Sequence, residues 1–406
     1  MPIRPSEQQL DEFLTRAVSE VFVREDLRSA LATGDRRLRV KQGFDPTRPN
    51  LHLGHVVCLR KLRTLAEWGH EIVIVIGDYT TQIGDPTDKD ETRPTMSHEE
   101  VLANAQTYLE QFHRIVPHEG TRIVYQTEWY GGFGLKDVIH LAARFSVQQL
   151  LAREEFRNRI AAKTAIPIKD LLYPLLQAYD SVAIESDLEV GGTDQQFNVL
   201  AGRELQEKVG QRPQNVFLIE LLEGLDGEKM SKSKPATGIW LTDAPNEMFG
   251  KLMAIKDELM PHYFEWATEL PLEDVRTTLS ALADGTFHPR DAKLKLARQV
   301  VSELHSPAAA AEAETAFVRT FRDGGRPADV PELRAVRPSG AGIVEVLTHL
   351  AVVKSRGEAR RLVEQGGVTI DGARATLDTN VDLDRGETDL QIGARRFWRV
   401  VWEPPR

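Results

Sequence analysis

The stretch from Arg37 to Asp78, RLRVKQGFDPTRPNLHLGHVVCLRKLRTLAEWGHEIVIVIGD, decides the fold. Its first eight residues predict a strand. Residues 51–68 predict a helix, because apolar side chains recur every three residues and share one face. These side chains are Leu53, Val56, Leu59, Leu62 and Leu65. Residues 71–78 predict a second strand, whose unbroken apolar run is typical of a parallel strand covered on both faces. Strand, helix and strand within about 40 residues form a βαβ unit, which favours a Rossmann-like, parallel-sheet α/β domain that binds a nucleotide.

The length and composition bound the class of protein. A chain of 406 residues predicts two or three domains, and 41% hydrophobic with 28% charged residues argues against long disorder. A single cysteine, Cys58, excludes a disulfide framework and a multi-cysteine zinc site. The first residues contain no apolar segment, and no later run approaches the roughly 20 apolar residues that span a bilayer. We therefore expect a cytoplasmic protein with no membrane partner.

The rest of the chain divides into blocks. Residues 226–322 are rich in helix formers and predict a helical domain, and the Gly/Pro-rich residues 323–340 predict a linker. Beyond it, SRGEARRLVEQGG has Ser355 and Glu358 at capping-box spacing, and Asp371-Gly372 is a hairpin signal. Residues 341–406 therefore predict a small α+β module, and residues 1–225 the nucleotide-binding domain.

Charge is distributed unevenly. The net charge is −10, but residues 341–406 contain ten Lys and Arg residues against ten Asp and Glu residues, and nine of the ten basic residues are arginines. Arginine binds phosphate through a rigid fork, and ARRFWRV places three arginines beside aromatic side chains. Charge alone favours the alternative, an ordinary solvated surface.

Two histidines stand where the helix of the βαβ unit begins. Such a helix terminus offers unpaired N–H groups to an anion, and His52 and His55, three residues apart, could point ring N–H groups at one phosphate chain. Gly54 leaves room for a flat ring against the backbone. A capping role and a metal site are the alternatives, although no third ligand stands at a recognisable spacing.

A second constellation is DGEKMSKSKP, residues 226–235. Its lysines and serines form a short cationic, hydroxyl-rich loop suited to clamping a polyphosphate, although a solvated charge run has the same composition. No G-x-x-x-x-G-K-[ST] motif is present, so a phosphate site must be made in another way.

Together, HLGH at 52–55 and KMSKS at 229–233 resemble the paired signatures of the class I aminoacyl-tRNA synthetases. GFDPTRPNLHLGH, IGDYTTQIGDPT, LLYPLLQAYDS and GGTDQQFN resemble the bacterial-type tyrosyl-tRNA synthetases in particular. SRGEARRLVEQGGVTIDG resembles the S4-type RNA-binding module that ends those enzymes. The resemblance covers about residues 40 to 400.

The resemblance implies a role for each matching residue. For ATP, His52 and His55 hold the phosphates, Lys229 and Lys232 stabilise the leaving pyrophosphate, Ser231 and Ser233 assist, Gly54 lies under the adenine and Asp194 binds the ribose. For tyrosine, Asp85, Tyr173 and Gln177 bind the ammonium, Asp45 and Gln195 lie near the carboxylate, and Asp180 takes the phenol hydroxyl. For tRNA, the candidate residues are Arg360, Arg361, Arg395 and Arg396, and no metal-binding residue is expected.

The implied activity is that of a tyrosine–tRNA ligase. ATP with Mg²⁺ activates L-tyrosine to tyrosyl-adenylate, and tyrosine is then transferred to the 3′ end of tRNA(Tyr). A homodimer is also implied, through an insertion at about 119–169. In one branch of the family a tyrosine that contacts the phenol occupies the position of Lys41, so the second phenol partner stays open. The rivals are a tryptophanyl-tRNA synthetase, a small-molecule nucleotidyltransferase and a non-catalytic RNA-binding protein.

Overall fold

The protein forms two compact units in a computed structural model that describes residues 2–85, 96–230, 235–322, 330–393 and 396–404. The first unit comprises Met1–Pro307 and the second Ala308–Arg406. Within the described parts of the chain, every helix is too short or too polar to cross a lipid bilayer.

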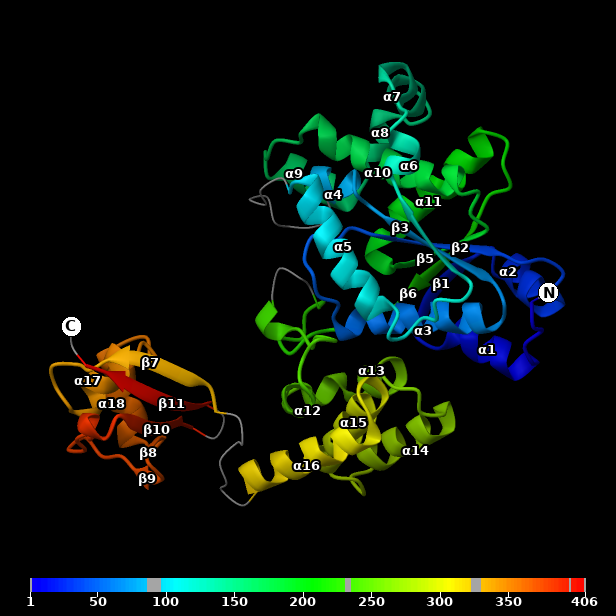
Figure 1. Cartoon of the computed structure of the whole chain (residues 1–406). Helices are drawn as coiled ribbons and strands as arrows, with labels where there is room; N and C mark the ends of the chain where they lie inside the picture. Colours follow the sequence, from blue (N-terminus) through cyan, green and yellow to red (C-terminus); the bar gives the residue numbers. More distant parts are fainter. Residues whose placement is uncertain (1, 86–95, 231–234, 323–329, 394–395, 405–406) are drawn as a thin grey trace. The chain divides into compact units, whose positions relative to one another are not determined.

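A six-stranded sheet forms the centre of the first unit, in the order β1-β6-β5-β2-β3-β4 (Figure 1). Five strands run parallel, and β1 pairs antiparallel with β6 at one edge. The strand order reverses beside β2, since β3 and β4 lie on one side of it and β5 and β6 on the other. Such a reversal opens a crevice at the carboxyl ends of the strands. The strands are β1 (Val18–Phe22), β2 (Arg39–Phe44), β3 (Glu71–Ile76), β4 (Thr121–Tyr125), β5 (Leu188–Gly192) and β6 (Asn215–Ile219).

The predicted βαβ unit is confirmed as β2, α3 (Leu53–Glu67) and β3. The five apolar side chains expected on one face of α3 are all fully buried, and α3 packs against β3 and β5. Gly69 follows the helix with a φ of +87°, a conformation that suits glycine and ends the helix. The unbroken apolar strand β3 is buried and pairs in parallel on both sides, as its sequence predicts.

Helix α10 (Ile168–Ala183) lies across the sheet from α3 (Figure 1). Tyr173, Gln177 and Asp180 are four and three residues apart along it, so they share one face. Burial of Tyr173 and Asp180 shows that this face is turned into the protein.

The other helices of the first unit include those of the predicted helical block after residue 226, α12 to α15, which pack on one another. They are α1 (Glu7–Thr15), α2 (Arg24–Thr33), α4 (Thr80–Ile83), α5 (His98–Phe112), α6 (Thr127–Tyr130), α7 (Leu135–Ala142), α8 (Val147–Leu151), α9 (Glu154–Ala161), α11 (Gln196–Lys208), α12 (Pro245–Met253), α13 (Met260–Trp266), α14 (Leu272–Ala283) and α15 (Pro289–Leu304), with 3₁₀ turns at Thr193–Gln195, Pro235–Thr237 and Asp257–Leu259.

The structure modifies the expected insertion at 119–169. Its first residues form β4, which pairs with β3 and belongs to the central sheet, so the segment that projects from the sheet consists of the helices α6 to α9. The helical block is also divided, because α16 (Pro307–Arg322) falls almost entirely in the second unit.

The second unit contains a five-stranded sheet in the order β7-β11-β10-β8-β9. β7 lies inside residues 323–340, which were expected to be a linker, and pairs in parallel with β11, so that expectation was wrong for this part. The hairpin signal is confirmed, since Asp371 and Gly372 have φ of +48° and +82° between β8 and β9. The elements are β7 (Glu332–Val336), α17 (Ile343–His349), α18 (Arg356–Glu364), β8 (Val368–Ile370), β9 (Ala373–Arg374), a 3₁₀ turn at Leu383–Arg385, β10 (Glu387–Ile392) and β11 (Arg396–Glu403).

The predicted start of α18 is also present. The Ser355 hydroxyl accepts a hydrogen bond from the Glu358 N–H (3.2 Å), whereas the Glu358 carboxylate accepts from the Lys354 N–H rather than from Ser355. The capping box is therefore only half formed. Apolar side chains of α17, α18 and the sheet, including Val346, Val363 and Trp402, form the core of this unit.

Candidate active site

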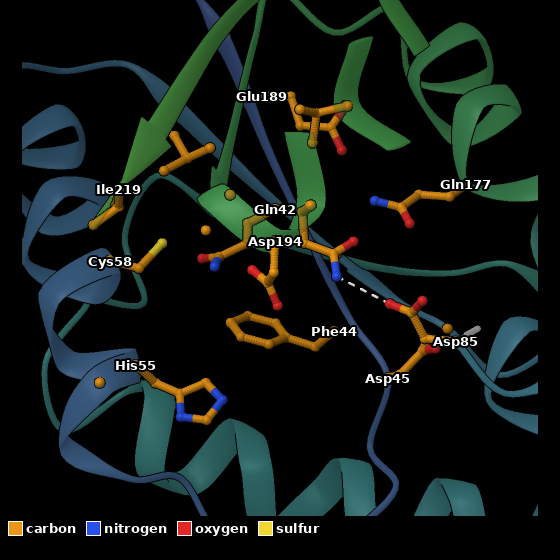
Figure 2. A pocket seen from close by; sticks show the side chains of 18 of the residues that line it. Gln42, Phe44, Asp45, His55, Cys58, Asp85, Gln177, Glu189, Asp194 and Ile219 are labelled. Atoms are coloured by element: carbon orange, nitrogen blue, oxygen red, sulfur yellow. Dashed lines mark hydrogen bonds between the residues drawn. The ribbon is translucent and has the colours of Figure 1, made fainter. Parts of the chain in front are cut away.

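A cavity of about 270 Å³ lies at the carboxyl ends of β2 and β5, where the strand order reverses (Figure 2). All eleven described residues that the sequence assigned to ATP or tyrosine line it. They are Asp45, His52, Gly54, His55, Asp85, Tyr173, Gln177, Asp180, Asp194, Gln195 and Lys229. Ser231, Lys232 and Ser233 lie outside the described residues, as does Arg395.

The two histidines meet at the start of α3. His52 is the N-cap residue, and its backbone N–H donates to Nδ1 of His55 at 3.2 Å, with the ring centroids 3.8 Å apart. A Cβ on Gly54 would lie 3.0 Å from Nδ1 of His52, which is closer than side chains normally approach. The missing side chain of Gly54 thus lets the His52 ring lie against the first turn of the helix.

Asp45 stands just beyond the end of β2 and is held from two sides. The Tyr173 hydroxyl donates to Asp45 Oδ2 at 2.8 Å, and the Thr80 hydroxyl donates to Oδ1 at 2.7 Å. Tyr173 comes from α10 and Thr80 from α4, so the carboxylate connects three elements around the cavity. Two donors at fixed positions orient this carboxylate.

Asp180 is a buried carboxyl group of the cavity wall. Oδ2 accepts from Nε2 of Gln126 at 2.8 Å, and Oδ1 accepts from the Trp129 indole at 3.2 Å. Burial raises the pKa of Asp180 to about 7, although the nearby Lys41 ammonium and the Gln126 amide oppose that shift. Glu189, also in the wall, raises this pKa further.

Lys41 is not among the described residues that line the cavity. Its Nζ lies behind the wall, 2.9 Å from Glu189 Oε1 and 2.8 Å from the Ser181 hydroxyl. A direct contact of Lys41 with a ligand in the cavity is therefore not supported, because the ammonium is turned toward these two side chains.

The lysine that opens the KMSKS segment also lines the cavity. The Lys229 ammonium forms an ion pair with the Asp194 carboxylate. The neighbouring Gln195 donates through Nε2 to Asp85 Oδ2 at 2.9 Å (dashed line in Figure 2) and accepts through Oε1 from Asn198 at 2.8 Å.

Sequence reasoning missed Gln126, Trp129 and Glu189. Gln126 directly follows β4, between that strand and α6, and Glu189 lies within β5. The rule that carboxyl ends of parallel strands meet at one edge could have found Gln126. The signal there is weak, because TRIVY is a short strand with polar residues at its start.

Comparison with known proteins finds tRNA synthetases that match nearly the whole chain. The model of the class I tRNA synthetases (W and Y) matches residues 33–322, and that of the S4 domain matches residues 342–386. The tyrosine–tRNA ligase of Dehalococcoides mccartyi strain CBDB1 is 45% identical over 98% of this chain and 99% of its own length. That of Moorella thermoacetica is 45% identical over 95% and 94%.

A solved structure has the same fold. Tyrosyl-tRNA synthetase from Archaeoglobus fulgidus, complexed with L-tyrosine, superposes with a TM-score of 0.60 and is 22% identical over 76% of this chain and 99% of its own. This likeness shows the fold, and the family matches above show the family. The chain belongs to the class I tRNA synthetases of the tryptophanyl and tyrosyl type, among the bacterial tyrosine–tRNA ligases that end in an S4 domain.

Proposed function

We propose that this protein is a tyrosine–tRNA ligase whose activation reaction takes place in the cavity beside β2 and β5. The observation that carries the proposal is that two chemically different groups of side chains line this cavity. Asp180 and its donor Gln126 line it, and so do His52 and His55 from the start of α3 and Lys229 from the KMSKS segment. A phenol and a polyphosphate are the ligands that these two groups of side chains suit.

Tyrosine would bind with its phenol hydroxyl donating to Asp180. Its ammonium would lie beside Asp85, Tyr173 and Gln177, and its carboxylate near Gln195. Asp45 lies near this carboxylate too, and the two hydroxyl groups that donate to Asp45 partly offset its negative charge. Tyrosine is thus held at both ends, which fixes the position of the reacting carboxylate.

ATP would occupy the part of the cavity at the start of α3. His52, His55 and the backbone N–H groups of the helix terminus are suited to the phosphates, and Asp194 to the ribose hydroxyls. Gly54 would leave room for the adenine. Lys229, with Lys232, Ser231 and Ser233, would stabilise the charge that develops on the pyrophosphate.

The activation step needs no general base. The tyrosine carboxylate is already an anion at pH 7, so one of its oxygens attacks the α-phosphorus while the bond to the leaving pyrophosphate breaks. A ribose hydroxyl at the 3′ end of tRNA(Tyr) then attacks the mixed anhydride and AMP leaves. The protein orients the groups and stabilises negative charge, which can supply much of the acceleration.

Mg²⁺ is proposed as part of the nucleotide substrate. Among the residues that the structure describes, no group of three or more His, Cys, Asp or Glu side chains is arranged to hold a metal ion. Mg²⁺ is commonly bound through substrate phosphates with only one or two protein carboxylates.

The second unit is proposed to bind tRNA through α18 and the start of β11. Arg360, Arg361 and Arg396 are exposed on these elements, and the S4 match covers α18. Arginine forks suit phosphate oxygens, and RNA backbone contacts depend on such charges. Arg395, outside the described residues, is proposed for the same role from its sequence position.

A homodimer is proposed through the helices that project after β4. Four large apolar side chains of α7 to α9 are more than half exposed, at 77%, 56%, 57% and 53%: Leu135, Ile139, Val147 and Ile160. Ile168, at the start of α10, is 77% exposed. Apolar side chains gathered in one segment indicate a surface that another protein covers. A mass measurement in solution tests this proposal, and a monomer mass at micromolar concentration would contradict it.

The test of the function is amino-acid-dependent exchange of labelled pyrophosphate into ATP. We expect exchange with tyrosine, and far less with tryptophan or phenylalanine. Faster exchange with tryptophan would favour the tryptophanyl rival, whose indole N–H could also donate to Asp180. Exchange that requires no amino acid would indicate a nucleotidyltransferase, and no exchange at all would contradict activation chemistry.

A further inference from the structure

A buried ion pair lies directly behind the cavity wall. The side chains of Lys41 on β2 and Glu189 on β5 are only 1% and 2% exposed, and Lys41 Nζ lies 2.9 Å from Glu189 Oε1. Removing two charges from water is costly, and a buried pair is often no more stabilising than apolar residues of the same size. This pair therefore calls for a reason other than stability.

The ammonium of Lys41 is directed at one turn of α10. It donates to the backbone carbonyl of Gln177 at 3.0 Å and to the Ser181 hydroxyl at 2.8 Å. The Ser181 hydroxyl in turn donates to Glu189 Oε2 at 3.0 Å. Asp180 belongs to this same turn, so the pair holds the backbone that carries the Asp180 carboxyl group and places a positive charge close to it.

The charged and polar groups around Asp180 can be assigned element by element. Lys41 approaches from β2 and Glu189 from β5, and the donors of Gln126 and Trp129 come from the segment after β4. The Tyr130 hydroxyl lies 3.5 Å from Oδ1 and donates to the Leu176 carbonyl at 2.6 Å. Asp78, at the end of β3, accepts from Thr127 instead.

Three helices also pack against α10. From α4, the Thr80 backbone N–H donates to Gln126 Oε1 at 2.9 Å, and from α11 the uncharged Gln206 amide donates to the Ser181 carbonyl. The titratable side chains of α7 are exposed to solvent, as are most of those of α11: Lys136, Asp137 and His140 on α7, and Glu204, Glu207 and Lys208 on α11, with Arg203 half-buried and bonded to the Gln214 carbonyl. Lys41 and Glu189 are thus the buried charges that face Asp180.

We propose that Lys41 is a positioning residue that determines specificity: its buried ammonium, held by Glu189 and Ser181, keeps Asp180 ionised so that the cavity prefers tyrosine to phenylalanine. The inference rests on the proposed function, because it assumes that Asp180 receives the phenol. An ionised carboxylate accepts a strong hydrogen bond from the phenol, and leaving it unpaired against a phenylalanine ring is costly. A neutral carboxyl group discriminates less, since it is cheaper to leave unpaired.

The pKa of Asp180 sets the pH range over which the preference for tyrosine should change. Burial raises that pKa to about 7 and Lys41 lowers it, so the carboxyl group titrates where small changes of nearby charge matter. Loss of the Lys41 charge should raise the pKa, and loss of the Glu189 charge should lower it. Preference for tyrosine should be high above the pKa and fall as the pH drops through it.

The experiment measures kcat/KM for tyrosine and for phenylalanine in pyrophosphate exchange from pH 5.5 to 8.5, and takes their ratio. The ratio cancels the titration of the common ammonium, carboxylate and ATP groups, and kcat/KM reports the free enzyme. Lys41→Met should move the midpoint of the ratio to higher pH by about one to two pH units, and Glu189→Gln should move it to lower pH. The double variant should return close to the unmodified midpoint.

Lys61→Met is the matched control. Lys61 is also buried and donates to a backbone carbonyl, that of Phe13 at 2.7 Å, but it lies outside the cavity wall. Its replacement should leave the midpoint unchanged even if it destabilises the fold. If Lys41→Met does not fold, the Glu189→Gln and double variants decide the matter, because the double variant removes both buried charges.

Opposite shifts in the two single variants support an electrostatic role. Midpoints that stay with the unmodified protein, or that move in the same direction in both single variants, would overturn this inference while leaving the proposed function intact. Absence of tyrosine-dependent exchange in the unmodified protein would instead overturn the proposed function, and this inference with it.

Discussion

At the scale of single residues, two opposite charges that line the cavity form an ion pair with one another. Lys229, assigned to the pyrophosphate, forms an ion pair with Asp194, assigned to the ribose. Both side chains are partly exposed, so the pair contributes little stability. ATP can therefore replace it at low cost, with the ribose taking Asp194 and the phosphates taking Lys229.

The proposed replacement of the Lys229–Asp194 ion pair by ATP predicts the effect of Lys229→Ala. If the ammonium acts mainly on the developing pyrophosphate charge, the rate constant of tyrosyl-adenylate formation should fall by roughly 10² to 10³, while the Kd of tyrosine stays within about twofold. Rapid-quench kinetics and equilibrium dialysis measure the two quantities.

Lys256→Ala is the control for that variant. The Lys256 ammonium lies near Gly227, at the base of the same segment, but pairs with Glu258 at 3.7 Å. It should leave the rate constant nearly unchanged. An equal loss of tyrosine affinity and rate in Lys229→Ala would indicate that Lys229 supports the structure of the cavity instead.

At the scale of elements, the start of α3 is built around the absence of a side chain at Gly54. A Cβ there would lie 3.0 Å from His52 Nδ1 and 3.1 Å from Cε1, so Gly54→Ala should push the His52 ring out of place. We expect the KM of ATP in pyrophosphate exchange to rise by roughly tenfold, equivalent to about 1.4 kcal/mol, with little change in the KM of tyrosine.

Gly250→Ala provides the comparison, because Gly250 lies in α12 with open space around the added Cβ. Alanine within a helix should be neutral there or stabilise the protein by roughly 0.5 to 1 kcal/mol. A Gly54→Ala protein with an unchanged KM for ATP would show that the position of the His52 ring does not matter for nucleotide binding.

The elements that sequence predicted are those whose pattern is local. α3 has a regular apolar face and β3 an unbroken apolar run, and both patterns can be recognised whatever the rest of the fold is. β7 was missed, because its alternating burial depends on pairing with β11, about 60 residues further on. Similarly, KMSKS and HLGH are contiguous motifs that can be recognised in the sequence. The role of Gln126 and Trp129 is visible only in the structure, where the segment after β4 brings them to Asp180.

At the scale of the whole molecule, the division into two units matches the division between the residues proposed for activation and those proposed for tRNA binding. The residues assigned to ATP and tyrosine lie in Met1–Pro307, and the arginines assigned to tRNA lie in Ala308–Arg406. A cut near Val336 would retain β7 without its partner β11 and leave an unpaired strand exposed. Ending the chain at Arg322 avoids this, since α16 stays whole and the second sheet is removed entirely.

The truncated chain should keep tyrosine-dependent pyrophosphate exchange within about twofold, while kcat/KM for tRNA charging falls by 10² or more, roughly the loss expected when several phosphate contacts are removed.

In the full chain, the pair Arg360→Ala and Arg361→Ala should lower the salt dependence of tRNA binding by about one to two in log–log slope. The control replaces Arg334 and Arg385, exposed arginines of the same unit that pair with Glu332 and Asp371. Because both double variants lose two charges, an equal drop in slope would mean that net charge, and not α18, binds the tRNA.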